Sequence, residues 1–264
     1  MGMPVVDFEL VCEIEPPTRP DLKHVRHQIG VLSSVAGTFL IPDNHIGRAT
    51  VSSVAVAHEV EAMGGRSIAC LNARDRNLLG LQRDLLTAAA YGVDQFLFVY
   101  GDEPRSGPRT SELTVRAMLS EARSFERSPD LSGATALRLG VVAGLGALPD
   151  WKREADFLFL QVGFSLDLLL QWNDRTQPLI PVYAGVIVLA SSGMARNLAR
   201  TIPDIQIPSS LVDRIDRDPN AGVEAACELL MAIRDTEAFQ GVHLIPVSRY
   251  RPVAARLEQL LREP

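Results

Sequence analysis

A strand in the middle of the chain ends at a carboxylate. Residues 95–100 are followed by Gly101, Asp102, Glu103 and Pro104. An apolar run without polar alternation predicts a strand that is buried on both faces. Glycine relaxes the backbone where the strand ends, and proline stops further pairing. Asp102 is therefore expected at the rim of an apolar core, where its protonation and hydrogen bonds can be tuned. Taken alone, the stretch is more typical of an ordinary turn, because Gly-Asp is common turn chemistry.

Polar side chains also follow the other predicted strands. The residues at these ends are Glu13, Asp43, Asn44, Asn72, Arg74, Asp75, Asp102, Gly144, Gln161, Tyr183 and Ser248. Two neighbouring carboxylates make each other's pKa values differ, so one can act as a general acid while the other stays charged. Such a set suits proton transfer to a polar heterocycle.

Histidine and cysteine give no metal-binding pattern. The five histidines are scattered, and so are the three cysteines, so no metal site is expected. His24, His27 and His58 lie on predicted helices and are expected at the surface. His45, beside Asp43 and Asn44, fits a loop or a site equally well.

Eight strand–helix units position these residues. The predicted strands cover residues 8–14, 38–41, 66–71, 95–100, 137–143, 157–160, 179–183 and 242–247. The predicted helices cover residues 20–34, 50–63, 78–91, a segment capped by Thr110 or Ser111 and ending near 125, then 166–172, 194–201, 209–216, 221–238 and 252–261, with one or two turns at 151–155. Regular alternation predicts a parallel sheet, and eight units predict a single (β/α)8 TIM-type barrel over residues 1–264. A doubly wound sheet is the alternative, but Pro16-Pro17 stands where its phosphate-binding glycine turn would be.

Composition narrows the possible partners. The chain of 264 residues is 47% hydrophobic and 22% charged, with a net charge of −6. An acidic balance argues against nucleic acid or an anionic membrane as the main partner. Neither a signal-peptide pattern nor an apolar run of about 20 residues is seen, so we expect no membrane span and a cytoplasmic location. A homo-oligomer or a partner subunit stays open.

Short motifs in a fixed order resemble those of methylenetetrahydrofolate reductases. The match is closest to the form fused to homocysteine methyltransferases, and it spans nearly the whole chain. The motifs are Glu13-Ile14-Glu15-Pro16-Pro17, Asp43-Asn44 with Gly47-Arg48-Ala49, the stretch 73–82, Gly101-Asp102-Glu103-Pro104, and the stretches 160–164, 179–182 and 207–208. Each motif is weak alone, whereas the ordered set is specific.

The resemblance implies a flavoprotein of one-carbon metabolism and methionine biosynthesis. In that family, hydride passes from NADH or NADPH through FAD to methylenetetrahydrofolate, which becomes methyltetrahydrofolate. By resemblance, Glu13 is the general acid that opens the folate ring, Asp102 lies beside the flavin and pterin, and Gln161 contacts folate. The resemblance also implies cofactor contacts at Asp43, Asn44, Cys70, Asn72, Arg74, Tyr100, Gly101, Gly144 and Lys152. A partly buried glutamate can stay protonated near neutral pH, as an acid must.

The chain departs from the family mostly at flavin contacts. Cys70 stands in place of a histidine, Asn72 in place of the usual Thr, and Tyr100 in place of Thr or Arg. The region 144–156 is shortened, with Lys152 as the candidate for the family's lysine. Two alternatives therefore stay open. One is a reductase without FAD that passes hydride directly from NADH to a folate-like substrate. The other is a non-catalytic folate-binding paralogue or a partner-dependent subunit.

Overall fold

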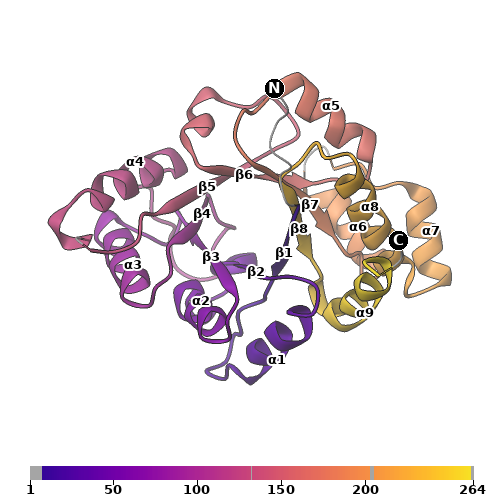
Figure 1. The fold of residues 1–264 in the computed structure, drawn as a ribbon, viewed down its shortest axis with the longest axis horizontal. Helices are drawn as coiled ribbons and strands as arrows, with labels where there is room; N and C mark the ends of the chain where they lie inside the picture. The colour runs from indigo at the N-terminus through magenta and orange to yellow at the C-terminus, as the bar shows by residue number, and fades with distance from the viewer. Residues whose placement is uncertain (1–7, 132, 203–204, 263–264) are drawn as a thin grey trace.

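The computed structural model of the chain describes residues 8–131, 133–202 and 205–262, which form a closed barrel of parallel strands (Figure 1). Each strand pairs with the next along the chain, and the last pairs with the first. The predicted (β/α)8 barrel is confirmed. The strands are β1 Glu9–Glu13, β2 Thr38–Ile41, β3 Arg66–Asn72, β4 Gln95–Val99, β5 Arg138–Ala143, β6 Phe157–Val162, β7 Val182–Ile187 and β8 Gly241–Ile245.

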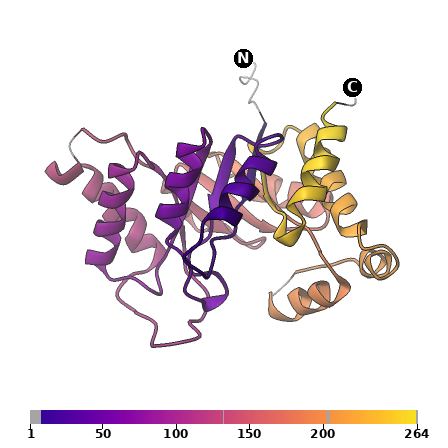
Figure 2. The same cartoon turned by 90° about the horizontal axis from the view of Figure 1, so that it is seen from below.

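Helices surround the ring of strands (Figure 1). They are α1 Lys23–Leu32, α2 Ser53–Ala62, α3 Leu78–Ala90, α4 Val115–Glu126, α5 Leu166–Thr176, α6 Ser192–Thr201, α7 Ser209–Arg217, α8 Ala221–Asp235 and α9 Tyr250–Leu260. A short 3-10 turn, Asp150–Glu154, stands in place of a full helix between β5 and β6. The long loop after β4 and helix α6 extend to the same side of the barrel (Figure 2). No helix in the described ranges is long and apolar enough to cross a membrane.

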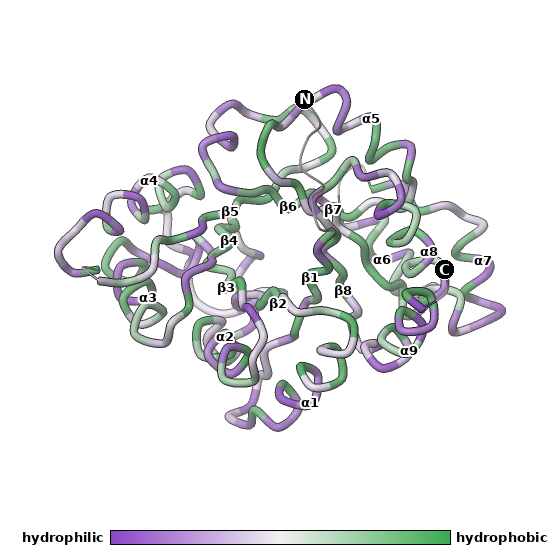
Figure 3. The backbone as a smooth tube through the Cα atoms, viewed as in Figure 1, coloured by the Kyte–Doolittle hydropathy of each residue, from purple (hydrophilic) through white to green (hydrophobic). Residues whose placement is uncertain are grey.

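Apolar packing on both sides of the sheet holds the barrel together. Hydrophobic residues follow the strands, while hydrophilic residues gather on the outer turns of the helices (Figure 3). Helix α1, for example, buries Val25, Ile29 and Leu32 at helical spacing against the sheet. A second cluster fills the inside of the barrel with Val11, Leu40, Ile68, Cys70, Leu97, Phe157, Phe159 and Tyr183. The interior is therefore packed, and open space is left only toward the strand ends.

Helix α4 starts later than predicted. Thr114 caps it, since its side chain accepts a hydrogen bond from the backbone N–H of Ala117 at 3.1 Å. The predicted cap Thr110 instead donates its hydroxyl to the carbonyl of Arg76 at 2.8 Å. Its backbone N–H donates to the carbonyl of Arg74 at 2.7 Å. Thr110 thus fastens the loop after β4 to the turn after β3, and this long-range contact is invisible in the local pattern.

Strand β7 also starts later than predicted, at Val182 instead of Leu179. Leu179 is 90% exposed and has a positive φ of 61°, so it lies in the preceding turn. Pro181 has no N–H to give to a ladder, and the strand begins directly after it. Tyr183 consequently lies near the start of β7, opposite Gly241, and not at its carboxyl end. Ser248 lies beyond β8, in the 3-10 turn Val247–Arg249.

A polar layer fills the barrel at the amino ends of the strands. The Glu9 carboxylate accepts hydrogen bonds from Thr38 Oγ1 at 2.6 Å, Arg66 Nη2 at 2.6 Å and the Tyr183 hydroxyl at 2.5 Å. Burial, followed by the bond to Glu9, raises the pKa of Tyr183, so its hydroxyl keeps its proton and donates it. This layer leaves the opposite end of the barrel for a site.

We expect Tyr183→Phe to lower the free energy of unfolding by about 1–3 kcal/mol, because Glu9 loses a buried charge-assisted hydrogen bond. Urea unfolding measures the change. Tyr91→Phe, at an exposed tyrosine, is the matched control and should change stability by less than about 0.5 kcal/mol. Equal losses in the two variants would show that the bond to Glu9 contributes nothing.

Candidate functional site

Polar side chains at the carboxyl ends of the strands border a cavity of about 640 Å³, which we call the mouth cavity. This volume is in the range of small-molecule sites. Its walls are apolar side chains of the barrel, such as Leu97, Phe159 and Ile245. Its polar residues are Glu13, Asp43, His45, Asp102, Lys152, Gln161 and His243.

The three residues expected to act on folate come together here. Glu13 is the last residue of β1, Asp102 follows β4, and Gln161 lies one residue before the end of β6. All three border the mouth cavity, although they are far apart in the sequence. An acid, a second carboxylate and an amide facing one apolar cavity can protonate and orient a polar heterocycle.

Sequence reasoning missed His243, which lies beside Glu13. The Nε2 atom of His243 is 3.3 Å from Oε2 of Glu13, and the two side chains are 10% and 18% exposed. The histidine ring packs on Phe159, with 4.9 Å between the ring centres. One signal was present in the sequence: His243 interrupts the apolar run of the last strand, where Val242 and Leu244 alternate with it and point outward into the core.

Asp102 also holds a turn above the cavity. Its Oδ2 accepts a hydrogen bond from the backbone N–H of Ile46 at 2.6 Å, and Ile46 has a positive φ of 59°. Arg105 fixes the same turn, since its backbone N–H donates to the carbonyl of Gly47 at 2.9 Å. A side chain at Gly47 would lie 1.9 Å from the carbonyl of Glu103. The loops after β2 and β4 are thus locked together, with Asp102 at the junction.

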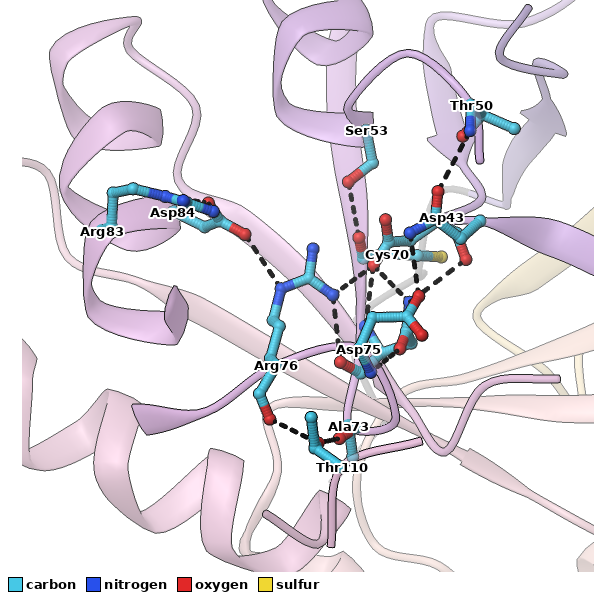
Figure 4. Close-up of polar contacts among 12 residues, drawn as sticks. Asp43, Thr50, Ser53, Cys70, Ala73, Asp75, Arg76, Arg83, Asp84 and Thr110 are labelled. Atoms are coloured by element: carbon cyan, nitrogen blue, oxygen red, sulfur yellow. Dashed lines mark hydrogen bonds and ion pairs between the residues drawn. The ribbon is translucent and has the colours of Figure 1, made fainter. Parts of the chain in front are cut away.

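Several residues that the resemblance assigns to the cofactor bond to one another instead. Arg76 lies between Asp84 and Asp43 (Figure 4). Asp43 also accepts hydrogen bonds from the backbone and side chain of Asn72, at 3.0 and 2.8 Å. The side chains of Arg76 and Asp43 are only 10% and 4% exposed. We call this set the Asp43–Arg76 network.

Asn44 and Arg74 are engaged with neighbouring loops as well. Asn44 Nδ2 donates to Asp75 at 2.8 Å. Arg74 Nη1 donates to Glu103 at 2.8 Å, and its guanidinium lies 4.5 Å from the ring centre of Tyr100. The described residues that border the mouth cavity do not include Asn44, Asn72 or Arg74.

The remaining residues of that set reach a cavity. Asp43, Cys70, Tyr100, Gly101 and Lys152 border the mouth cavity. Burial, followed by the charge of Glu13, raises the pKa of Cys70, so the thiol stays protonated. Burial lowers the pKa of Lys152, whose Nζ donates to the carbonyl of Val142 at 2.8 Å. Gly144 borders a neighbouring cavity of about 470 Å³, which shares Gln161 with the mouth cavity.

A further cavity adjoins the mouth cavity, beneath helix α6. It has about 690 Å³, and we call it the α6 cavity. Glu13, His45, Asp102 and Ile245 border both cavities. The α6 cavity adds the carboxylates of Glu15 and Glu103 and the apolar side chains of Ile187, Met194, Leu198 and Ile202. Two ligands could therefore meet at Glu13 and Asp102. No group of three or more His, Cys, Asp or Glu residues in the described part of the chain could hold a metal ion.

Comparison with known proteins gives a fold and no family. No family model matches the chain, and no curated protein matches its sequence. An uncharacterized protein from Clostridium thermocellum that binds two copies of 5-methyl-5,6,7,8-tetrahydrofolic acid is similar in structure, with a TM-score of 0.65, 11% identity and 96% of each chain covered. The EDTA monooxygenase EmoA from Chelativorans sp. BNC1 has a TM-score of 0.53 at 10% identity, over 97% of this chain and 95% of the other. The long-chain alkane monooxygenase LadA has a TM-score of 0.54 at 10% identity, over 96% and 91%. At such identities these likenesses show the barrel fold alone, and the resemblance to methylenetetrahydrofolate reductases stays a prediction.

Proposed function

We propose that this barrel is an oxidoreductase that reduces methylenetetrahydrofolate to methyltetrahydrofolate. The observation that carries the proposal is that Glu13, Asp102 and Gln161 border one apolar cavity of suitable size. The structural likeness to a protein that binds a methyltetrahydrofolate supports the same class of ligand. In this proposal the pterin lies in the mouth cavity between Glu13, Asp102 and Gln161.

The carboxylates around the mouth suit the charges of this reaction. Glu13 donates a proton to the folate nitrogen that leaves the methylene carbon, and the opened ring becomes a cation. A hydride from NADH or NADPH then reduces that cation to the methyl group, and the nicotinamide ring becomes positively charged. Asp102, with Glu15 and Glu103 nearby, stabilises positive charge where it develops. The sum is one proton and one hydride added to the substrate and one nicotinamide oxidised.

The adjoining cavities of this site favour direct transfer from NADH or NADPH over a route through FAD. The side-chain amides of Asn72 and Asn44 and the Nη1 atom of Arg74 donate hydrogen bonds to neighbouring residues. Among the described residues that border the mouth cavity, Lys152 is the single lysine or arginine, and its Nζ already donates to Val142. The residues of the mouth cavity therefore fit the diphosphate of FAD poorly, because an anion needs charged or N–H donors. NADH and NADPH carry a diphosphate as well, so the adjoining cavities, and not this contact, favour direct transfer. Direct transfer also needs two ligands side by side, and the mouth and α6 cavities adjoin at Glu13.

Purified protein tests the proposal through its absorption spectrum and its turnover. We expect colourless protein that oxidises NADH or NADPH only when methylenetetrahydrofolate is present, with methyltetrahydrofolate as the product. Yellow protein with flavin absorption would establish the FAD route instead. Folate binding without turnover would support the non-catalytic paralogue or the partner-dependent subunit. Absence of any folate binding would overturn the proposal.

We expect Asp102→Asn to lower turnover or folate affinity by about tenfold, as the loss of one charge-assisted contact does. The melting temperature should change little, because the Asn oxygen still accepts the N–H of Ile46. Asp130→Asn, at an exposed carboxylate in the 3-10 turn between α4 and β5, is the matched control for both measurements. A loss of stability with unchanged kinetics would mean that Asp102 only holds the turn.

A further inference from the structure

His243 is held inside the barrel by the pairing of β8 with β1. It lies opposite Val11 in the ladder, and the residue as a whole is 8% exposed. Residues alternate across a strand, so His243 points to the barrel interior, as Glu13 does two residues beyond Val11. Strand closure therefore brings the imidazole beside the carboxylate, a pairing that the local sequence does not show.

The Nε2 atom of His243 makes no regular hydrogen bond among the described residues, although it is fully buried. Among the described residues, the ion-pair partner of this atom is Glu13 Oε2, at 3.3 Å. The distance between Nε2 and Oε2 would allow a hydrogen bond, so it is the angle between the ring and the carboxylate that prevents a regular one. A buried donor without a partner is costly and rare. Catalytic hydrogen bonds are often misaligned without substrate and tighten when it binds.

The surroundings leave these two groups dependent on each other. Phe159 covers one face of the imidazole. The other titratable groups that border the same two cavities are Glu15, Asp43, His45, Cys70, Tyr100, Asp102, Glu103 and Lys152. Among the described contacts, Glu13 forms an ion pair with His243 alone. Asp43, Asp102 and Lys152 have the other partners given above.

We propose that His243 is a positioning residue that shares one proton with Glu13 and supplies it for each turnover. The proton rests on Nε2 of the imidazolium, which holds the carboxylate of Glu13 in place. When substrate binds, Nε2 passes its proton to Oε2, and the carboxyl group of Glu13 donates a proton to the substrate nitrogen. The imidazole is then neutral and the carboxylate negative, and one proton from solvent restores the pair. The proposal rests on the proposed function, in which Glu13 is the acid.

His243→Gln distinguishes the supply of a proton from the hydrogen bond to Glu13, since the glutamine amide can donate a hydrogen bond but cannot give up a proton. We expect turnover to fall by about 10- to 100-fold at neutral and alkaline pH, with the KM for folate within about twofold of wild type. The pH above which turnover falls should move down, because the pair keeps its shared proton until the imidazolium gives it up, whereas a carboxyl group alone has lost its proton at a lower pH. His58→Gln, at an exposed histidine, should leave the kinetics and the pH profile unchanged.

Wild-type turnover with a wild-type pH profile in His243→Gln would overturn the proposal. A rise in KM with unchanged turnover would also overturn it, because His243 would then only contact substrate. Circular dichroism and the melting temperature show whether the variant is folded. If the glutamine variant does not fold, His243→Asn gives the same comparison with a shorter side chain.

A measurement without substrate separates this proposal from the proposed function. Nitrogen-15 NMR of the His243 ring reports whether both ring nitrogens carry protons, and the spectrum of His243→Gln identifies its signals. We expect the doubly protonated ring to persist to higher pH in wild type than in Glu13→Gln. Identical titrations in the two proteins would reject the pair even if the protein reduces folate. A shifted titration in a protein without reductase activity would keep the pair and reject the function.

Discussion

Glu13→Gln is expected to lower the rate of folate reduction by about 10²- to 10⁴-fold, the usual contribution of a general acid. Glutamine has nearly the same shape as the protonated acid but cannot release a proton to the substrate. The carboxyl group is the one that borders both cavities and contacts His243. Steady-state rates with methylenetetrahydrofolate and NADH measure the loss, and a folate-binding assay should show affinity within about tenfold of wild type.

The matched control for this variant is Glu228→Gln, at an exposed position of helix α8. Its kinetics should equal those of wild type. The melting temperature of Glu13→Gln should also stay near the wild-type value, because the side chain is partly open to the cavities. Wild-type turnover in Glu13→Gln would mean that another group, or water, is the acid.

Arg76→Met is expected to lower the free energy of unfolding by about 3–5 kcal/mol, because it leaves a buried carboxylate without its counter-charge. Burial disfavours the charge on Arg76, but the neighbouring Asp43 and Asp84 outweigh it and raise the pKa of the guanidinium. Asp43 is almost fully buried, so water cannot replace the arginine. Chemical denaturation measures the change.

Arg83→Met is the matched control, since Arg83 pairs with the same Asp84 from the surface, where its side chain is 72% exposed. Exposed pairs contribute about 0–1 kcal/mol, so the control should lose little. The double variant Asp43→Asn with Arg76→Met should recover part of the lost stability, because the unpaired charge is gone. A loss in Arg76→Met no larger than in Arg83→Met would mean that the network is not stabilising.

The local pattern of apolar and polar residues was sufficient to predict where the strands of the first half of the barrel end. Glu13 ends an apolar strand, Asp43 and Asp102 follow two others, and a parallel barrel gathers such ends at one mouth. The pattern could not tell which polar atoms would be left for a ligand. Asp43 and Asn72 end neighbouring strands, and Arg76 follows on the turn, so the three bond to one another. Arg76 appeared in the sequence only as part of a motif, because its partners Asp43 and Asp84 lie in the loop after β2 and on helix α3.

By itself the sequence determined the class of fold and three residues of the proposed folate site. Regular alternation of apolar strands and amphipathic helices predicts a barrel, and strand ends carry Glu13, Asp102 and Gln161 to its mouth. Only the tertiary structure decided which side chains face the interior beside them. His243 reaches Glu13, and Tyr183 reaches Glu9 at the opposite end, because the register of β8 and β7 is set by barrel closure. Periodicity reports which residues are buried, whereas partners across strands depend on non-local pairing.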